Sequence, residues 1–405
     1  MASDNLDRLS NSPKEVIDAI LARMPVRDAV KTSFLSKGWR YRWMSMPVLV
    51  IKRERGSGYP IAFVNKLLLL HEGIVSKFEL DDFLKTSSDV NHWILVLSRK
   101  TVNDLKLNFQ PNDNYQVPSC LFCCQSLRKL ELGGCLLKLP SDYRGFCGLT
   151  QLILSYVTLT NETFHSLLLK IPLLQTLLIN YCKSLTHFNI HALNLKEFTV
   201  EGDCESFNFQ NAPNVKVAKI KVSLPGFPVR FKLDDDLQGL DRVESLTLFN
   251  PFVEFLPTDI AQERLDITYS HLTDVCLHVN FEDVKQILAV LCLCRSAPRL
   301  ETFKINAIWD RKSALSYEEN FWEVGLHKED AVFDHLKTVS LSHFKGVKND
   351  MGFVQFILLK AGGLKTFCIN WEVNAAMDVK KHVLEKMMEF QRASTICKVV
   401  FKNKA

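Results

Sequence analysis

The chain has 405 residues, of which 47% are hydrophobic and 23% are charged, a composition typical of a folded protein and unlike that of a disordered one. Its longest apolar runs, residues 67–70 and 287–294, are far shorter than the roughly 20 residues that a membrane-spanning helix needs. The first residues, Met1-Ala2-Ser3-Asp4, include an acid and no apolar segment of the signal-peptide kind. These features predict a cytoplasmic or nuclear protein without membrane contact. The length admits two or three ordinary domains, or one small domain and a long repeat array.

The net charge of +5 is concentrated at the N-terminus. Residues 1–60 contain 11 Lys and Arg against 6 Asp and Glu, whereas the remaining 345 residues contain 39 of each sign. A nucleic-acid-binding protein usually carries a basic stripe along its main binding surface. Because the excess is confined to a small N-terminal segment, we expect an acidic protein partner and no nucleic acid.

The 12 cysteines are expected to be buried side chains and not disulfides, because the predicted compartments are reducing. Cys120-x-x-Cys123-Cys124 has the first half of a zinc-site spacing. No second cysteine or histidine pair follows at the distance that a zinc finger requires. The sequence therefore predicts no metal site.

Residues 7–43 are predicted to form three short helices. Pro13 suits a first helical position, and Pro25 ends the apolar stripe that follows it. Asp28 can open a second helix and Ser36 a third, over residues 37–43. The apolar side chains of the three helices are Val16, Ile17, Ile20, Leu21, Met24, Ala29, Val30, Phe34, Leu35, Trp39 and Trp43. So small a unit can bury little surface, so these side chains either pack on the next domain or form an interface with a partner.

The same residues occur in the order of a known motif. The segment reads Asp7-x-Leu9-Ser10, Pro13-x-Glu15-Val16-Ile17, Ile20-Leu21-x-x-Met24-Pro25-Val26-Arg27-Asp28-Ala29-Val30 and Thr32-Ser33-x-Leu35-Ser36-Lys37-x-Trp39-Arg40-x-x-Trp43. Over residues 7–43 it resembles an F-box. The resemblance implies docking onto a Skp-type adaptor, which joins the protein to a cullin scaffold that carries a RING subunit.

The family's adaptor contacts, carried over to this sequence, fall on ten side chains. They are Leu9, Pro13, Val16, Ile17, Ile20, Leu21, Met24, Val30, Leu35 and Trp39. Trp43 is expected to brace the fold instead. Two positions depart from the family pattern, because Ser12 stands where the family has leucine and Gly38 where a basic residue is common. Losing a buried leucine at an interface costs on the order of 2 kcal/mol, so weaker docking is expected.

A short apolar phrase recurs from about residue 75 onward. The clean copies are Leu127-x-x-Leu130-x-Leu132 and Leu149-x-x-Leu152-x-Leu154. Looser copies begin at Val75, Val102, Leu174, Leu195, Val217, Val243, Leu272, Leu300, Leu336, Leu364 and Ile396. The starts at residues 127, 149, 174, 195 and 217 are 22, 25, 21 and 22 residues apart, within the ~20–29 residues of leucine-rich repeats. Later spacings are longer and less regular.

One such unit cannot bury its apolar face alone, so the copies must stack. The predicted fold class is α/β: a small three-helix F-box followed by a leucine-rich-repeat solenoid. Its parallel sheet would line the concave face, with helices such as residues 164–171 and 284–294 outside.

The last 75 residues carry a second resemblance. Phe333-x-x-Leu336-Lys337-x-Val339, Phe344-x-Gly346, Phe353-Val354-x-Phe356-x-Leu358-Leu359 and Leu364 look like the FBD segment that follows the repeats in a large plant F-box family. The predicted domains are an F-box at 1–47, a linker or solenoid start at 48–74, leucine-rich repeats at 75–330 and FBD-like C-terminal repeats at 331–405.

The sequence contains no phosphate-binding glycine loop, no nucleophile elbow and no HExxH, so neither a catalytic residue nor a cofactor is predicted. Aromatic residues just past the predicted strands are candidates for a substrate-binding rim, with packing between repeats as the alternative: Phe109, Tyr156, Tyr181 and Trp371. The concave face is expected to present a mixed set with no repeated cluster for a small ligand: Gln151, Thr176, Glu197, Lys219, Ser245 and Asp274.

The sequence therefore predicts a non-enzymatic substrate-recognition adaptor of a Skp–cullin–F-box E3 ubiquitin ligase. The F-box would dock the Skp-type adaptor, and the repeats would bind the protein to be ubiquitinated. Two alternatives stay open. One is a repeat-based interaction scaffold whose degenerate F-box no longer docks a ligase, and the other is a receptor that holds a small molecule.

Overall fold

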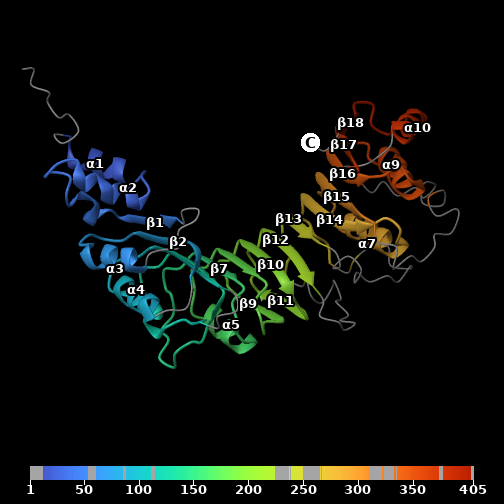
Figure 1. Ribbon diagram of the computed structural model, residues 1–405. Coiled ribbons are helices and arrows are strands. Elements are labelled where there is room, and N and C mark those ends of the chain that lie inside the picture. Colours follow the sequence, from blue (N-terminus) through green and yellow to red (C-terminus); the bar gives the residue numbers. More distant parts are fainter. Residues whose placement is uncertain are drawn as a thin grey trace, which may run out of the picture. The chain divides into compact units, whose positions relative to one another are not determined.

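The computed structural model describes residues 12–52, 61–84, 88–110, 115–223, 237, 239–249, 265, 267–309, 322, 333, 335–373 and 377–402. Leu9 of the predicted docking set lies outside these residues. The chain divides into two compact units, Met1–Leu185 and Thr186–Ala405, and each is described by itself (Figure 1).

The N-terminal segment of the first unit is helical but less regular than predicted. It contains α1 (Lys14–Leu21), α2 (Val26–Lys31) and the 3-10 turns η1 (Thr32–Phe34) and η2 (Arg42–Ser45). Pro13 and Pro25 hold the N-cap positions of α1 and α2, so the second helix begins before Asp28, the predicted start. The prediction of a third helix at 37–43 is wrong. Turns around Gly38 precede η2, because glycine weakens a helix.

Six strands of the first unit form a parallel sheet. In spatial order they are β1 (Val48–Lys52), β2 (Lys77–Leu84), β3 (Asp104–Phe109), β5 (Lys129–Gly133), β7 (Gln151–Ser155) and β8 (Thr176–Asn180). Alternate side chains are buried, and the buried ones stand opposite each other across the strands. One such column runs through Leu105, Leu130, Leu152 and Leu177, all at most 2% exposed.

Helices cover one side of this sheet. They are α3 (Ile61–Leu70), α4 (Ser88–Ser98) and α5 (Asn161–Leu168), with the 3-10 turn η3 (Ser119–Cys123) (Figure 1). The helix α5 begins where Thr160 caps it, because the Thr160 hydroxyl accepts a hydrogen bond from the Thr163 amide at 3.2 Å. A short two-stranded sheet, β4 (Tyr115–Gln116) with β6 (Cys135–Leu136), also joins two of the loops.

The second unit repeats this architecture with eight parallel strands. They are β10 (Glu197–Asp203), β12 (Val217–Ser223), β13 (Ser245–Leu248), β14 (Asp274–Asn280), β15 (Thr302–Ile308), β16 (Thr338–Phe344), β17 (Thr366–Trp371) and β18 (Lys398–Lys402). The helices are α7 (Val284–Arg295), α9 (Lys348–Lys360) and α10 (Met377–Met388). A separate two-stranded sheet lies in this unit, where β9 (His187–His191) pairs in parallel with β11 (Ser206–Asn211). Their phenylalanines pack together, with the Phe188 and Phe207 rings 5.4 Å apart.

The recurring phrase predicts the strands of the large parallel sheet well, because nearly every one of them begins two residues after a phrase start. Leu127 precedes Lys129 of β5 in this way, and Leu300 precedes Thr302 of β15. The phrase assigned to Val217 is out of register by two residues. Val217 pairs with Ser245, itself two residues past a phrase start, so the buried residue that begins this copy is Val215.

The sheet begins earlier than the predicted repeats. The strand β1 starts at Val48 and pairs with β2 in parallel from Val48 opposite Lys77 to Lys52 opposite Asp81. Its run of Val48-Leu49-Val50-Ile51 suits a buried parallel strand. Residues 48–52 thus belong to the sheet. The other domain boundaries remain predictions.

The FBD-like segment folds as the β16–α9–β17 part of the second unit. Asp350 fixes the turn before α9, because its Oδ2 accepts hydrogen bonds from the amides of Lys345 and Gly346, both at 2.9 Å. The carboxyl is fully buried, and this burial raises the pKa of Asp350 to about 7 against the lowering effect of the amides. Phe353 packs nearby against Phe281, with the rings 5.4 Å apart.

A glycine at the end of β5 provides a test of the repeat geometry. Gly134 has φ 64°, and a Cβ there would lie 2.1 Å from the Phe109 carbonyl oxygen of the neighbouring repeat. We expect Gly134→Ala to lower the free energy of unfolding by more than about 1 kcal/mol. The control is Gly362→Ala, where nothing lies within 4 Å and a change below about 0.5 kcal/mol is expected. Denaturant unfolding measures both, and equal effects would contradict the close approach.

Candidate protein-binding surfaces

The N-terminal helical segment exposes large apolar side chains. Phe34 is 89% exposed, Leu35 68% and Tyr41 65%, while Val16 on α1 is 46% exposed. Phe34 and Leu35 follow one another at the end of η1, and Tyr41 directly precedes η2. Soluble proteins expose neighbouring large apolar side chains mainly where another molecule covers them. This segment is therefore a candidate protein-binding surface.

The nine predicted docking residues that the structure describes divide by burial. Val16, Leu35 and Pro13 are exposed, and Ile20, Met24 and Val30 are half-buried. Ile17, Leu21 and Trp39 are only 1%, 0% and 5% exposed, so in this conformation they build the core and offer no surface to a partner. Trp43, predicted to brace the fold, is 6% exposed. Docking through the accessible residues stays a prediction.

Phe34 was predicted to be an apolar side chain of the second helix, and it is instead the most exposed large hydrophobic residue of the segment. The helix α2 ends at Lys31, and η1 continues with three residues per turn instead of 3.6. The tighter turn directs Thr32 inward, where its hydroxyl donates to the Ala29 carbonyl at 2.6 Å. Phe34 and Leu35 then face solvent. A search for apolar residues at α-helical spacing assumes 3.6 residues per turn throughout, so it could not reveal that the turn tightens here.

Basic side chains accompany the exposed apolar ones. Lys37 and Arg40 are both exposed and lie within five residues of Leu35. Lys31 is held by a surface ion pair to Asp28 at 2.9 Å, a contact that contributes little to stability. The surface thus combines apolar area with positive charge, as the N-terminal charge excess predicts.

The exposed sheet face of the first unit carries a lattice of ion pairs. Lys77 Nζ lies 2.9 Å from Glu79 Oε2, and Lys106 Nζ lies 3.7 Å from Glu79 Oε1 and 3.0 Å from Glu131 Oε1. Burial raises the pKa of Glu79, but the hydrogen bond and charge of Lys77 outweigh it, and the net effect is a lowered pKa. The same hydrogen bond raises the pKa of Lys77. These charges are neutralised by one another.

Two tyrosines form an exposed aromatic pair beside this lattice. Tyr156 and Tyr181 follow β7 and β8, and their rings stack with centroids 5.5 Å apart at 13°. They are 45% and 39% exposed. Both have positive φ, 56° and 48°, which costs a non-glycine residue roughly 1–2 kcal/mol. Next to them the Asn180 amide donates to the Ser155 hydroxyl at 3.3 Å. The pair offers a flat apolar surface with polar groups at its edge.

The other two aromatic candidates are not part of an exposed rim. Phe109 is fully buried and stacks on Tyr115 at 4.2 Å. Trp371 is 4% exposed and stacks on Phe401 at 5.4 Å. Both lie inside their strands, at positions that alternate inward. The prediction of substrate contact is corrected for these two, which pack between repeats.

The predicted concave-face set lies on one face of the strands, and all of its members but one share a single cross-strand row. Gln151 pairs with Thr176, and Ser245 pairs with Asp274, and each is exposed or half-buried. Lys219 lies two residues farther along its strand than the other members, because Val217 is the residue that pairs with Ser245. The sequence analysis missed a chain of contacts farther along the strands. The Phe249 and His278 rings are 4.3 Å apart, and the Asn306 amide nitrogen lies 3.1 Å from His278 Nε2.

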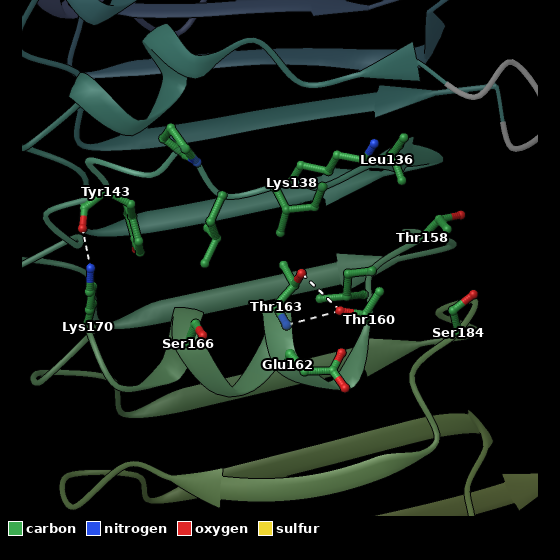
Figure 2. A pocket seen from close by; sticks show the side chains of 14 residues that line it. Leu136, Lys138, Tyr143, Thr158, Thr160, Glu162, Thr163, Ser166, Lys170 and Ser184 are labelled. Carbon is green, nitrogen blue, oxygen red and sulfur yellow. Dashed lines mark hydrogen bonds between the residues drawn. The ribbon is translucent and has the colours of Figure 1, made fainter.

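A hollow of about 570 Å³ lies beside α5 in the first unit (Figure 2). Hydroxyls of Thr158, Thr163 and Ser166 line it, together with Lys138 and Lys170. Lys170 Nζ donates to the Tyr143 carbonyl, so this ammonium group already has a partner. Among the residues that line this hollow, there is neither a buried charged side chain nor an arrangement of side chains that would support catalysis.

The cysteine motif has no sign of metal chemistry. Cys120 and Cys123 lie on η3, and Cys124 follows it. Burial raises the pKa of Cys124 to about 12 and also raises that of Cys120, which disfavours the thiolate that a metal requires. Among the described residues, no group of three or more His, Cys, Asp or Glu side chains is arranged to hold a metal ion. No helix in the described part of the chain is long and apolar enough to span a membrane.

Three family models match this chain. The F-box domain matches residues 13–50, the LRR repeats of FBD-associated F-box protein At5g56370 match residues 90–230, and FBD matches residues 332–369. The three segments follow one another in the order that the sequence predicted.

Full-length relatives have the same organisation in their names. F-box/FBD/LRR-repeat protein At1g13570 of Arabidopsis thaliana is 28% identical, covering 98% of this chain and 98% of that protein. FBD-associated F-box protein At5g56370 of the same plant is 24% identical over 98% of this chain and 100% of its own length. A Listeria monocytogenes internalin structure covers 85% of this chain and 95% of its own at 12% identity, but its TM-score of 0.38 is too low to support an argument.

The tyrosine pair leads to a stability prediction that separates binding from packing. Tyr156→Gly removes the stack, worth about 0.5–1.5 kcal/mol, and relieves a positive-φ strain of similar size. We expect the free energy of unfolding to change by less than about 1 kcal/mol. The matched control Leu154→Ala, in the core of the same strand, should cost about 2–5 kcal/mol. A loss above about 2 kcal/mol for Tyr156→Gly would show that the ring serves packing.

Proposed function

This chain belongs to the F-box/FBD/leucine-rich-repeat proteins, and we propose that it is a substrate-recognition adaptor of a Skp–cullin–F-box E3 ubiquitin ligase. The N-terminal segment would dock a Skp-type adaptor and, through it, a cullin–RING core. The repeats would hold the protein to be ubiquitinated. The proposed role is non-catalytic and belongs to the cytoplasm, the nucleus or both.

The exposure of Phe34 and Leu35 is the observation that carries this proposal. Burying a large apolar side chain contributes about 1.5–3 kcal/mol, so a partner that covers both gains substantial affinity. Neighbouring Lys37 and Arg40 would attract an acidic partner and raise the association rate. The segment also contacts the chain just before the predicted repeats, because the amide of Glu72 donates a hydrogen bond to the Met44 carbonyl at 3.0 Å.

The alternative scaffold function rests on the two departures from the F-box pattern. Gly38 gives it little support, because a Cβ at this position would meet only the Ser36 hydroxyl, at 3.7 Å. A Cβ fits there without a clash, so the glycine removes a basic side chain from the surface and forms part of the turns that precede η2. Ser12 is half-buried and directly precedes Pro13, so it is the departure that bears on docking.

The docking proposal is tested with the full chain and a purified Skp-type adaptor. We expect the double variant Phe34→Ala/Leu35→Ala to weaken binding by at least about 2 kcal/mol in calorimetry, because apolar area at the contact is lost. Leu69→Ala is the matched control, since Leu69 on α3 is 82% exposed and lies outside the F-box. Undetectable binding by the unmodified chain at tens of micromolar would favour the scaffold alternative. Unchanged affinity of the double variant would place docking elsewhere.

A second variant should strengthen docking. Ser12→Leu restores the apolar side chain that the family has before the proline, and a gain of about 1–2 kcal/mol is expected if the position is desolvated in the complex. The same calorimetric titration measures it, with Ser12→Ala as a control that removes the hydroxyl without adding much area. An affinity equal to that of the unmodified chain would mean that residue 12 faces water in the complex.

A further inference from the structure

The last strand of the second unit has an open edge. In the described part of the chain β18 pairs only with β17, in parallel, from Lys398 opposite Thr366 to Lys402 opposite Asn370. The Lys398 amide donates to the Lys365 carbonyl at 3.0 Å, which directs its backbone groups toward β17. Successive residues of a strand direct their backbone groups to opposite sides. The N–H and C=O groups of Val399 and Phe401 therefore point away from the sheet.

The side chains of this edge form a distinct pattern. Lys398, Val400 and Lys402 are exposed on one face of β18, and Val399 and Phe401 are half-buried on the other. The exposed face of β18 thus carries a basic side chain, an apolar one and a second basic one in succession. Cross-strand neighbours stand about 5 Å apart, so a strand added here would place three of its side chains against these three.

The last helix is also incompletely covered. Met377, Leu384 and Met388 lie on one side of α10 at i, i+7 and i+11, and they are 77%, 39% and 82% exposed. The buried stripe of α10 is a different one, formed by Val383 and Met387. Terminal repeats of solenoids normally present a polar outer face. Within the described residues, this repeat instead exposes apolar side chains on its helix and backbone groups without a partner strand on β18.

We propose that the open edge of β18 binds an extended segment of another protein as an additional strand. The bound segment carries acidic side chains opposite Lys398 and Lys402, with an apolar side chain between them opposite Val400. Unpaired backbone supplies the hydrogen bonds and the side-chain pattern supplies the selectivity. This interaction goes beyond the proposed ligase function and does not depend on adaptor docking.

Charge selects this partner over a second copy of the chain. Two β18 edges paired antiparallel about Val400 would place Lys398 opposite Lys402 on both sides, and like charges directly opposite are destabilising. Lysine on an exposed edge is a known device against self-pairing. With these two lysines counted, residues 377–402 contain six Lys and Arg against three Asp and Glu, so this part of the chain carries a net positive charge. An acidic strand converts the same lysines into attractive contacts.

Labelled synthetic peptides test the proposal against the full chain. The probe is a heptapeptide with Glu at positions 2 and 6, Val at position 4 and Thr elsewhere, so that two Glu side chains and the Val between them share one face of the added strand. Its binding is measured by fluorescence anisotropy. Two matched peptides serve as controls: one has Lys in place of Glu, and the other is the Glu peptide N-methylated at alternate amides. We expect the Glu peptide to bind at least about ten times more tightly than the Lys peptide. N-methylation on the pairing side should abolish binding, because it removes the backbone donors.

Variants of the chain then locate the site. Val399→Pro removes an outward N–H that β17 does not use, so it should abolish peptide binding and leave the thermal midpoint nearly unchanged. Lys398→Glu/Lys402→Glu should reverse the preference toward the Lys peptide. Lys219→Glu/Lys304→Glu is the control, because these exposed lysines occupy the same face on strands β12 and β15.

Four results would overturn the proposal. They are no binding of the Glu peptide at millimolar concentration, equal affinity for the Glu and Lys peptides, binding that survives N-methylation, and a loss of binding only in the Lys219/Lys304 control. A concentration-dependent dimer in sedimentation, abolished by Val399→Pro, would identify a second copy of the chain as the occupant instead. If Val399→Pro fails to fold, the N-methylated peptide and the charge reversal still decide the outcome.

Discussion

The fold depends on columns of buried side chains that run from strand to strand in register. Leu105, Leu130, Leu152 and Leu177 form one such column, and no repeat could bury its member without a neighbour on each side. Every strand therefore needs a strand or another element beyond it. At the first strand, the helix α2 contacts β1, so the helical segment covers part of that end. At β18 no described element fulfils this role.

The same columns explain what the sequence could predict. The apolar phrase marks strands because alternate burial and parallel pairing demand apolar residues at fixed offsets, and most strands follow from it. The copy at Val217 shows the limit. A shift of two residues preserves the alternation of a strand, so Val215 and Val217 fit the pattern equally well and only pairing with Ser245 decides between them. The third N-terminal helix was predicted because Ser36 could open it, and a start signal does not report the local effect of Gly38 within the segment.

The surface residues were less predictable than the core for a related reason. Phe34 does not point in the direction expected for an α-helix, because the three residues of the 3-10 turn η1 rotate the following side chains by a different angle. The spacing of apolar residues in the sequence does not reveal this change. Among the aromatic candidates, Phe109 and Trp371 lie inside strands and are buried, whereas Tyr156 and Tyr181 lie just beyond strands at positive φ. The hydrophobicity of these four aromatic side chains does not distinguish the buried ones from the exposed ones. The backbone conformation at the strand end determines which ring reaches solvent.

Charged side chains are arranged differently on the sheet face of the first unit, on the N-terminal helical segment and on the edge of β18. On the sheet face of the first unit, Lys77 and Lys106 are occupied by Glu79 and Glu131, so an incoming partner would have to compete with existing ion pairs. Selectivity there must come from neutral groups such as the stacked tyrosines. The N-terminal segment holds the net charge of the chain beside exposed apolar side chains, which favours fast association with an acidic partner. At β18 the lysines add selectivity to backbone hydrogen bonds, which alone would accept any extended strand. The three proposed binding surfaces thus differ in their balance of charge, shape and backbone pairing.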